Sequence, residues 1–345
     1  MKSLVTFLGK YIYIILVFFL TITLTSCSIT DDSSESLTQE SQTETSASEE
    51  GNESRTEPSF EDYESYMGYI SDKSNFQPYY KTVFAFEEVP GGMDNVPIQK
   101  LKVMYEEMKE VFDYVLISEY PLYYRGYYEG DLRFVDGYEQ DQTSNENLDI
   151  STLINVTGYD FEGNETIITP LKTVLLGEGI FSRFSNSIAE GRNLQTTDFK
   201  LASPDQPISV VLGNAYKDIY KIGDTFSLEL ISEVMNFQVV GFYKPGVNFS
   251  METGALHNVD FDYTIVMPHF IPDYEPNGDS AFFQHAFHIA ELTSGYIAIS
   301  EPVQQIKDDT YEDIIITMEE MAKRNGLDNF YKIPYWPVGF VWNDE

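Results

Sequence analysis

Hydrophobic and polar residues follow three different patterns along the chain. An apolar run extends from Tyr11 to Leu24, after the basic residues Lys2 and Lys10. Residues 28–58 are polar and include no aromatic side chain. Beyond residue 59, apolar positions recur at regular spacing between Gly, Pro and Asn residues. The pattern therefore predicts one folded region, residues 59–345, preceded by two segments that do not contribute to its core.

Both ends of the folded region have the periodicity of α/β units. Near its start, Thr82–Glu87 predicts a strand, and apolar residues at helical spacing after Pro97 predict a helix. Tyr114–Ser118 is a short apolar run that predicts a buried strand. The same order returns later, with a strand at Gly295–Ser300 and a helix capped by Asp309. The pattern predicts an α+β fold in which one lobe is built from both termini around a large insertion.

The middle of this region, from about 119 to 275, predicts mainly strands and turns. Its best-defined part is 191–243, where Arg192 is expected to anchor a loop through hydrogen bonds to carbonyls or a carboxylate. Asp198 is expected to form a cap and Asp224 to serve a turn. The elements predicted here are a short helix at 214–220 and strands at Ile208–Gly213, Thr225–Ile231 and Phe237–Tyr243.

The first segment has the layout of a secretory signal peptide, with a basic start, an apolar centre and small residues at the end. That end, Leu24–Cys27, resembles the lipobox of bacterial lipoproteins. The resemblance implies that residues 1–26 are removed and that a diacylglyceryl group is attached to the Cys27 thiol. Two acyl chains give lasting membrane attachment. The alternative is an ordinary signal peptide or membrane anchor with a chance cysteine.

The second segment predicts a disordered tether. Residues 27–58 are rich in Ser, Thr and Glu and contain almost nothing that can be buried, so burial cannot offset the entropy of ordering them. The protein is thus expected to be lipid-anchored at the cell membrane, with its folded region on the extracellular or periplasmic side.

Composition narrows the classes of partner. The formal net charge is −35, which argues against nucleic acid, because phosphate binding needs a basic surface. Anionic lipid would also repel the chain, so we expect the lipid on Cys27 to provide the contact with the membrane. Cys27 is the single cysteine, which excludes an intramolecular disulfide and a Cys-ligated metal cluster. No later apolar run approaches the roughly 20 residues of a membrane span.

The order of elements in the middle of the chain resembles one known family. Gly191-Arg192-x-Leu, a downstream Asp198, the strand at 208–213, Ile222-Gly223-Asp224 and the strand at 237–243 follow one another. This series resembles the periplasmic core domain of MacB-type ABC-transporter permeases, and residues 154–161 resemble the strand and turn that precede it. The resemblance covers most of residues 75–335.

The resemblance implies a ferredoxin-like α/β "porter" lobe made from both ends, at about 75–118 and 290–345. It also implies an inserted β-rich "sabre" lobe at about 119–289. Such permeases carry four membrane helices, which this chain lacks, and lipidated Cys27 would replace the first. The function implied is a non-catalytic interaction module of an ABC export or permease system, with a permease or export component as partner. The alternative is a solute- or peptide-binding lipoprotein, and a hydrolase ranks third.

Catalytic and metal-binding patterns are weak. His285-x-x-His288 can place two imidazoles on one helical face, and His257, Asp260 and Asp262 lie upstream, but the glutamate of the HExxH zincins is missing. We expect satisfied histidines in a packed or partly exposed helix instead. The chain has no Gly-x-Ser-x-Gly motif, and its many carboxylates single out no pair. No catalytic residue, metal or cofactor is therefore assigned.

A cluster of tyrosines is the candidate interaction site. Tyrosine offers rigid, amphipathic contact area, which favours recognition surfaces. The alternative is a hairpin whose tyrosines cover the β-rich lobe. The candidate residues are Tyr120, Tyr123, Tyr124, Arg125, Tyr127 and Tyr128.

Overall fold

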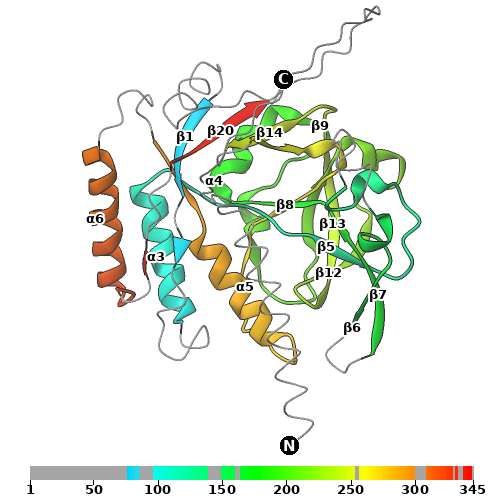
Figure 1. Cartoon of the computed structure of the whole chain (residues 1–345), viewed down its shortest axis with the longest axis horizontal. Helices are drawn as coiled ribbons and strands as arrows, with labels where there is room; N and C mark the ends of the chain where they lie inside the picture. Colours follow the sequence, from blue (N-terminus) through cyan, green and yellow to red (C-terminus); the bar gives the residue numbers. More distant parts are fainter. Residues whose placement is uncertain are drawn as a thin grey trace, which may run out of the picture. The chain divides into compact units, whose positions relative to one another are not determined.

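The computed structural model describes residues 76–81, 83–84, 96–138, 149–159, 164–252, 256–299, 308–328, 331–332 and 337–343. All of them belong to the compact unit Ser59–Glu345. The predicted signal peptide, the lipidation site at Cys27 and the tether lie outside the described residues. The described part is a mixed α+β fold with a large curled sheet, which confirms the predicted fold class at that level (Figure 1).

The first sheet contains strands from both ends of the folded region, and we call it the terminal sheet. It has six strands in the order β15-β14-β20-β1-β18-β3, and each pair of neighbours is antiparallel. The strands are β1 (Phe76–Lys81), β3 (Tyr114–Val115), β14 (Asn248–Glu252), β15 (Leu256–Asp260), β18 (Tyr296–Ala298) and β20 (Pro337–Asn343).

Three long helices pack against this sheet. Helix α3 (Ile98–Val111) lies between β1 and β3 in the chain, α5 (Ala281–Thr293) precedes β18, and α6 (Asp308–Arg324) lies between β18 and β20. Helix α3 contacts both α5 and α6 (Figure 1). The predicted helices at both ends are thereby confirmed, although α6 begins at Asp308, so Asp309 lies inside the helix and does not cap it. Their buried faces form one core with the sheet through Leu101, Met104, Met108, Ile289, Leu292, Ile297, Met318 and Met321.

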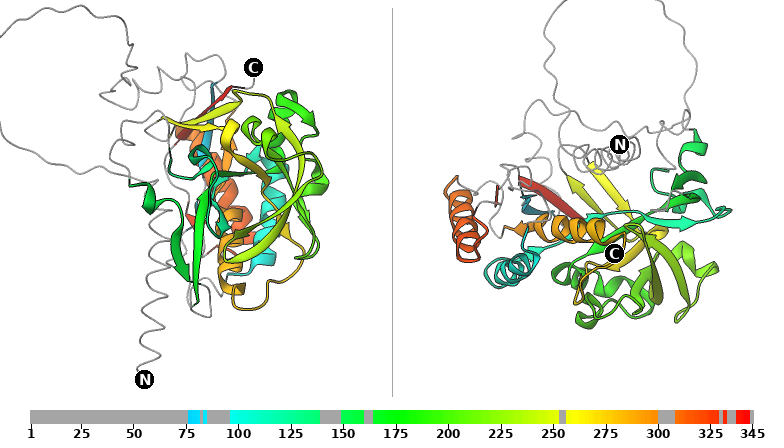
Figure 2. Two further views of the ribbon diagram at one scale, coloured as in Figure 1. Left: turned by 90° about the vertical axis from the view of Figure 1, so that its right-hand side faces the viewer. Right: turned by 90° about the horizontal axis from the view of Figure 1, so that it is seen from below.

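The second sheet has ten strands and forms a curved layer (Figure 2). Its order is β4-β8-β16-β11-β13-β12-β5-β7-β6, and β9 also pairs with β13. Two short pairs, β10 (Lys200–Leu201) with β17 (Ile271–Pro272) and β2 (Val83–Phe84) with β19 (Tyr331–Lys332), lie apart from it. The ten strands are β4 (Ile117–Glu119), β5 (Leu122–Arg125), β6 (Val156–Tyr159), β7 (Glu165–Leu171), β8 (Thr173–Leu176), β9 (Ile188–Gly191), β11 (Ile208–Leu212), β12 (Thr225–Leu230), β13 (Glu233–Tyr243) and β16 (Ile265–Pro268).

The predicted strand at 114–118 is divided between the two sheets. Residues 114–115 form β3 of the terminal sheet, and 117–119 form β4 of the ten-stranded sheet. Successive side chains of a strand point to opposite sides. Tyr114 and Leu116 accordingly pack in the helix-covered core, whereas Val115 and Ile117 pack in a second core. One short apolar run therefore contributes to two hydrophobic cores.

The division into lobes also differs from the sequence-based boundaries. Strands β14 and β15 fall within the segment 119–289 that was expected to form the inserted lobe. In the structure Phe249 pairs with Trp342 and Ser250 with Val341, so these strands extend the terminal sheet. Their own sequence alternates like any strand and does not indicate which sheet they join.

Four buried rings link the two sheets. Phe261 lies close to Phe184, Tyr243 and Phe249, with centroid distances of 5.0, 4.9 and 5.7 Å. Tyr243 belongs to β13 of the ten-stranded sheet, whereas Phe249 belongs to β14 of the terminal sheet. All four side chains are fully buried. The two sheets therefore share one hydrophobic core, which we call the shared core.

Among the residues that the structure describes, no helix is long and apolar enough to cross a bilayer.

Candidate functional site

The structure divides the candidate tyrosines between half-buried positions (Tyr120, Tyr123 and Tyr128) and exposed ones (Tyr124 and Tyr127). Tyr120 packs edge-on against Phe287 of α5, with ring centroids 5.1 Å apart. Burial raises the pKa of Tyr120, and it raises the pKa of Tyr123 to about 12. Tyr120 therefore belongs to the packing against α5, whereas the alternative interpretation placed these tyrosines over the β-rich lobe.

The exposed group lies at the end of β5 and in the loop that follows. Tyr124 is 38% exposed and Tyr127 is 75% exposed. The ring of Tyr128 meets that of Tyr124 edge-on at 5.8 Å. We call residues 124–130 the tyrosine loop.

Hydrogen bonds fix the backbone of the tyrosine loop. The Gly126 N–H donates to the Ile167 carbonyl at 2.7 Å, and a φ of +115° at Gly126 suits only glycine. The Tyr128 N–H donates to Asn155 Oδ1 at 2.6 Å, and Asn155 Nδ2 donates to the Tyr128 carbonyl at 3.3 Å. The Tyr128 hydroxyl donates to the Asp131 carbonyl at 2.9 Å. The loop thus holds Tyr127 exposed on a backbone that is fixed on both sides.

The arginines near the tyrosine loop are paired with carboxylates. Arg125 forms an ion pair with Glu229 at 2.5 Å, so its guanidinium serves the contact between β5 and β12. Arg133 pairs with Asp131 and lies over the ring of Tyr263 at 4.7 Å. Among the predicted site residues, Arg125 therefore stabilises the contact between two strands.

Further aromatic rings adjoin the loop in space. Tyr220 lies within electrostatic reach of Tyr124, and its ring is 4.9 Å from that of Phe226. Both are half-buried. Sequence reasoning missed them because they follow the tyrosine loop by about one hundred residues. The pairing of β5 with β12, which brings them close, leaves no local signal in the sequence.

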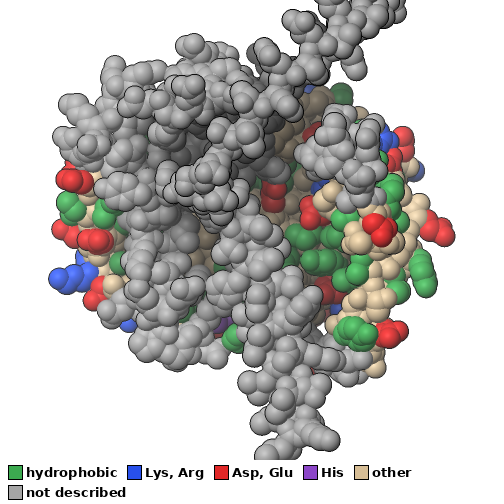
Figure 3. Space-filling model, viewed as in Figure 1, with side chains coloured by type: hydrophobic (Ala, Val, Ile, Leu, Met, Phe, Trp, Pro, Cys, Tyr) green, Lys and Arg blue, Asp and Glu red, His purple; other side chains and the backbone are tan. Residues whose placement is uncertain are grey.

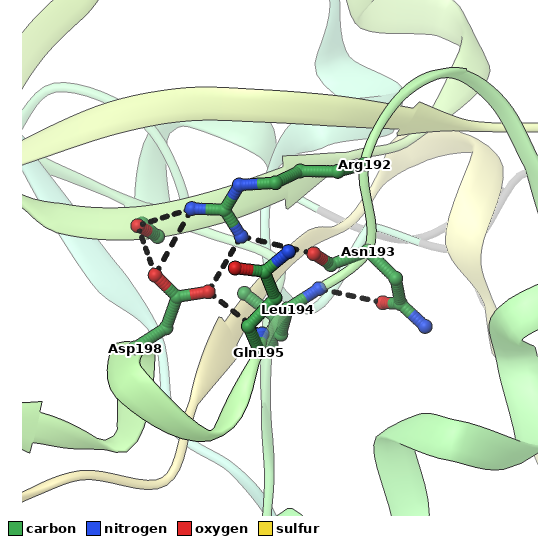
Figure 4. A network of polar contacts seen from close by, with 6 residues as sticks. Arg192, Asn193, Leu194, Gln195 and Asp198 are labelled. Atoms are coloured by element: carbon green, nitrogen blue, oxygen red, sulfur yellow. Dashed lines mark hydrogen bonds and ion pairs between the residues drawn. The ribbon is translucent and has the colours of Figure 1, made fainter.

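The Gly191-Arg192 element forms a polar network around one carboxylate (Figure 4). Arg192 Nη1 donates to Asp198 Oδ2 at 2.6 Å, and Nη2 donates to Oδ1 at 3.1 Å. Ser209 Oγ also donates to Asp198 Oδ1, at 2.8 Å, and the Gln195 N–H donates to Oδ2 at 2.7 Å. The predicted roles of Arg192 as a loop anchor and Asp198 as a cap are confirmed.

The environment of Asp198 favours its charged form. Burial raises the pKa of this carboxyl, but the hydrogen bonds from Arg192, Ser209 and Gln195 outweigh burial and lower it. The residue before Arg192 must be glycine. A Cβ at Gly191 would lie 2.4 Å from the Val240 carbonyl oxygen, and the φ of Gly191 is +76°. The element therefore holds the loop between β9 and β10 in place.

Replacing Arg192 with methionine is expected to lower the free energy of unfolding by about 1–2 kcal/mol, because Asp198 keeps its other two donors. Urea denaturation followed by circular dichroism measures the change. Arg183→Met is the control, since Arg183 lies 3.8 Å from an exposed Asp113, and such surface pairs contribute little. Equal losses in the two variants would contradict the role of Arg192.

The histidines of the His285-x-x-His288 pattern lie on α5 in different environments. His288 is buried between the rings of Phe270 and Phe287, at 5.7 and 5.4 Å, whereas His285 is half-buried. Among the described residues, no group of three or more His, Cys, Asp or Glu side chains is placed to hold a metal ion. The side chain of His257 lies outside the described residues. His288 is thus a core histidine of the kind that the sequence interpretation favoured.

Burial, together with the smaller effects of the nearby His269, Lys102 and His285, lowers the pKa of His288 to about 3 from an ordinary value of 6.5. Between these two values the unfolded chain binds the proton more readily than the folded protein. The contribution of His288 to stability is therefore complete above pH 6.5 and is lost as the pH falls toward 3, by about 1.4 kcal/mol per pH unit. Urea titrations at pH 7, 6, 5 and 4 should show a shallower loss for His288→Phe than for wild type. Parallel curves would contradict this assignment.

A buried cluster that the sequence did not indicate joins three elements. Glu291 of α5 accepts a hydrogen bond from Ser118 Oγ of β4. It also accepts one from Nε2–H of His269, the residue after β16, at 2.7 Å. We call Ser118, His269 and Glu291 the junction cluster. The Ser118 hydroxyl points to the carboxylate and not to the imidazole, so the geometry differs from that of an activated nucleophile.

Comparison with protein-family models gives no match for this chain, and comparison with curated proteins gives none either.

Proposed function

We propose that the protein is a lipid-anchored, extracytoplasmic interaction module of an ABC export or permease system, without catalytic activity of its own. The observation that carries this proposal is the topology, in which one sheet is built from both ends of the folded region around a large β-rich insertion. That is the organisation implied by the resemblance to the periplasmic core of MacB-type permeases.

The strand order supports a ferredoxin-like terminal lobe. Four adjacent strands, β20-β1-β18-β3, are antiparallel, with α3 between β1 and β3 and α6 between β18 and β20 in the chain. This is a split β-α-β arrangement used twice, as in ferredoxin-like folds. The ten-stranded sheet is inserted between β3 and β18, where a sabre-like lobe would lie.

The polar clusters of the described residues support interaction in preference to catalysis. Arg192 and Asp198 bind each other across a loop, and the junction cluster connects α5 with the ten-stranded sheet. A fixed loop with an exposed aromatic side chain, by contrast, is suited to binding a partner. The lipobox-like Leu24–Cys27 and the acidic tether would hold this surface near the outer face of a membrane protein.

Affinity purification of the full-length tagged protein from detergent-solubilised membranes tests this proposal. We expect a permease or its ATPase to copurify with the wild-type protein and to be depleted with Cys27→Ser, which cannot be lipidated. Recovery of no transporter component would contradict the proposal. A small solute that copurifies instead would favour a solute-binding lipoprotein.

A further inference from the structure

The tyrosine loop combines exposed aromatic faces with a fixed backbone. Tyr127 is the most exposed of the large hydrophobic side chains described, and Tyr124, three residues earlier in the chain, is exposed too. The side chain of Asn155 hydrogen-bonds to both the N–H and the carbonyl of Tyr128, and these two bonds fix the loop. Asn155 itself has a φ of +53°, a left-handed conformation that asparagine tolerates better than most residues. Little conformational entropy would be lost on binding at such a loop.

The charges around these rings are mainly negative. Glu129 is exposed in the loop, and the charges of Asp131 and Asp224 add to burial in raising the pKa values of Tyr128 and Tyr220, respectively. The neighbouring Arg125 and Arg133 are each paired with a carboxylate. These two pairs are neutral, and Glu129 and Asp224 are additional, so carboxylates outnumber arginines around the rings.

The surface view agrees with this distribution. Hydrophobic side chains gather over the region of β5, β12 and β13, and acidic side chains border them (Figure 3). The whole chain carries a net charge of −35. An anionic partner would be repelled here, while an aromatic face in a negative field attracts a cation.

We propose that the tyrosine loop binds a lysine- or arginine-bearing segment of a protein partner, with a cationic side chain against the faces of Tyr127 and Tyr124. Glu129 supplies further attraction at the rim of the contact. The assumption that the partner belongs to a transport system rests on the proposed function. The preference for a cationic side chain follows from the residues of the tyrosine loop.

Titration calorimetry on the purified full-length protein in neutral detergent tests this proposal, with a hexa-arginine peptide as probe. Tyr127→Leu removes the aromatic face but keeps apolar area, and should weaken binding about 3- to 30-fold, the range of a cation–π contact. Tyr127→Phe keeps the ring face and should bind like wild type. Phe282→Ala, at an exposed position on α5, controls for general attraction between the peptide and an acidic protein.

Equal affinity of wild type and Tyr127→Leu would overturn the proposal, because it would show binding to net charge alone. Absence of measurable binding by the wild type would overturn it as well. No transporter component is present in this titration. Its failure would therefore leave the proposed transporter function standing, whereas failure of the copurification would leave the cation site standing.

Discussion

Replacement of Phe184 by alanine is expected to lower the free energy of unfolding by about 3–5 kcal/mol, the range measured when a fully buried phenylalanine is truncated. The ring of Phe184 contacts Phe261 at 5.0 Å and also lies near Tyr243 and Phe249, which come from different sheets. The cavity would thus open where the ten-stranded sheet meets the terminal sheet. Because both sheets share this core, unfolding should remain a single transition.

Urea denaturation, followed by both tyrosine fluorescence and far-ultraviolet circular dichroism, measures this effect. Phe282→Ala is the matched control, since Phe282 is 38% exposed and its truncation should cost less than about 1 kcal/mol. A second transition in the Phe184 variant would indicate that the two sheets unfold separately. A loss as small as that of the control would contradict the shared core.

The second large effect is expected from Glu291→Leu, which removes the acceptor of the junction cluster. The hydroxyl of Ser118 and the Nε2–H of His269 would lose their shared partner, and His269 is 6% exposed. A buried polar group without a partner costs about 1–3 kcal/mol, so the two together should cost about 2–6 kcal/mol. Thermal and urea unfolding measure the loss.

Glu291→Gln separates hydrogen bonding from packing at this position. Glutamine keeps one acceptor oxygen and nearly the same volume, so it should recover about half or more of the lost stability. If leucine were tolerated as well as glutamine, the junction cluster would not contribute to the connection between α5 and the ten-stranded sheet.

Local patterns in the sequence predicted much of the fold. Helices α3 and α6 follow from apolar residues at helical spacing, and β11, β12 and β13 from short apolar or alternating runs. The roles of Arg192 as a loop anchor and Asp198 as a cap were also predicted, although the sequence did not indicate that the two bind each other. In each case, the interaction that decides the structure lies within a few residues of the pattern.

Pairing between distant segments could not be read in this way. Strand β14 joins β20 although their sequences are separated by about ninety residues, and nothing in either strand specifies the other. Among the candidate tyrosines, Tyr120 and Tyr127 have similar sequence surroundings, but α5 covers only the former. The junction cluster forms because three elements that are distant in the sequence come together in the fold. The spacing of Ser118, His269 and Glu291 along the chain therefore could not predict it.

Site-specific photocrosslinking in intact cells tests the central claim most directly. A photoreactive phenylalanine analogue would be placed at position 127 of the full-length protein, and at position 282 as an exposed control. The account predicts a discrete adduct with a permease component from position 127 and none from position 282. Equal labelling from both positions, or adducts with no transporter component, would contradict it.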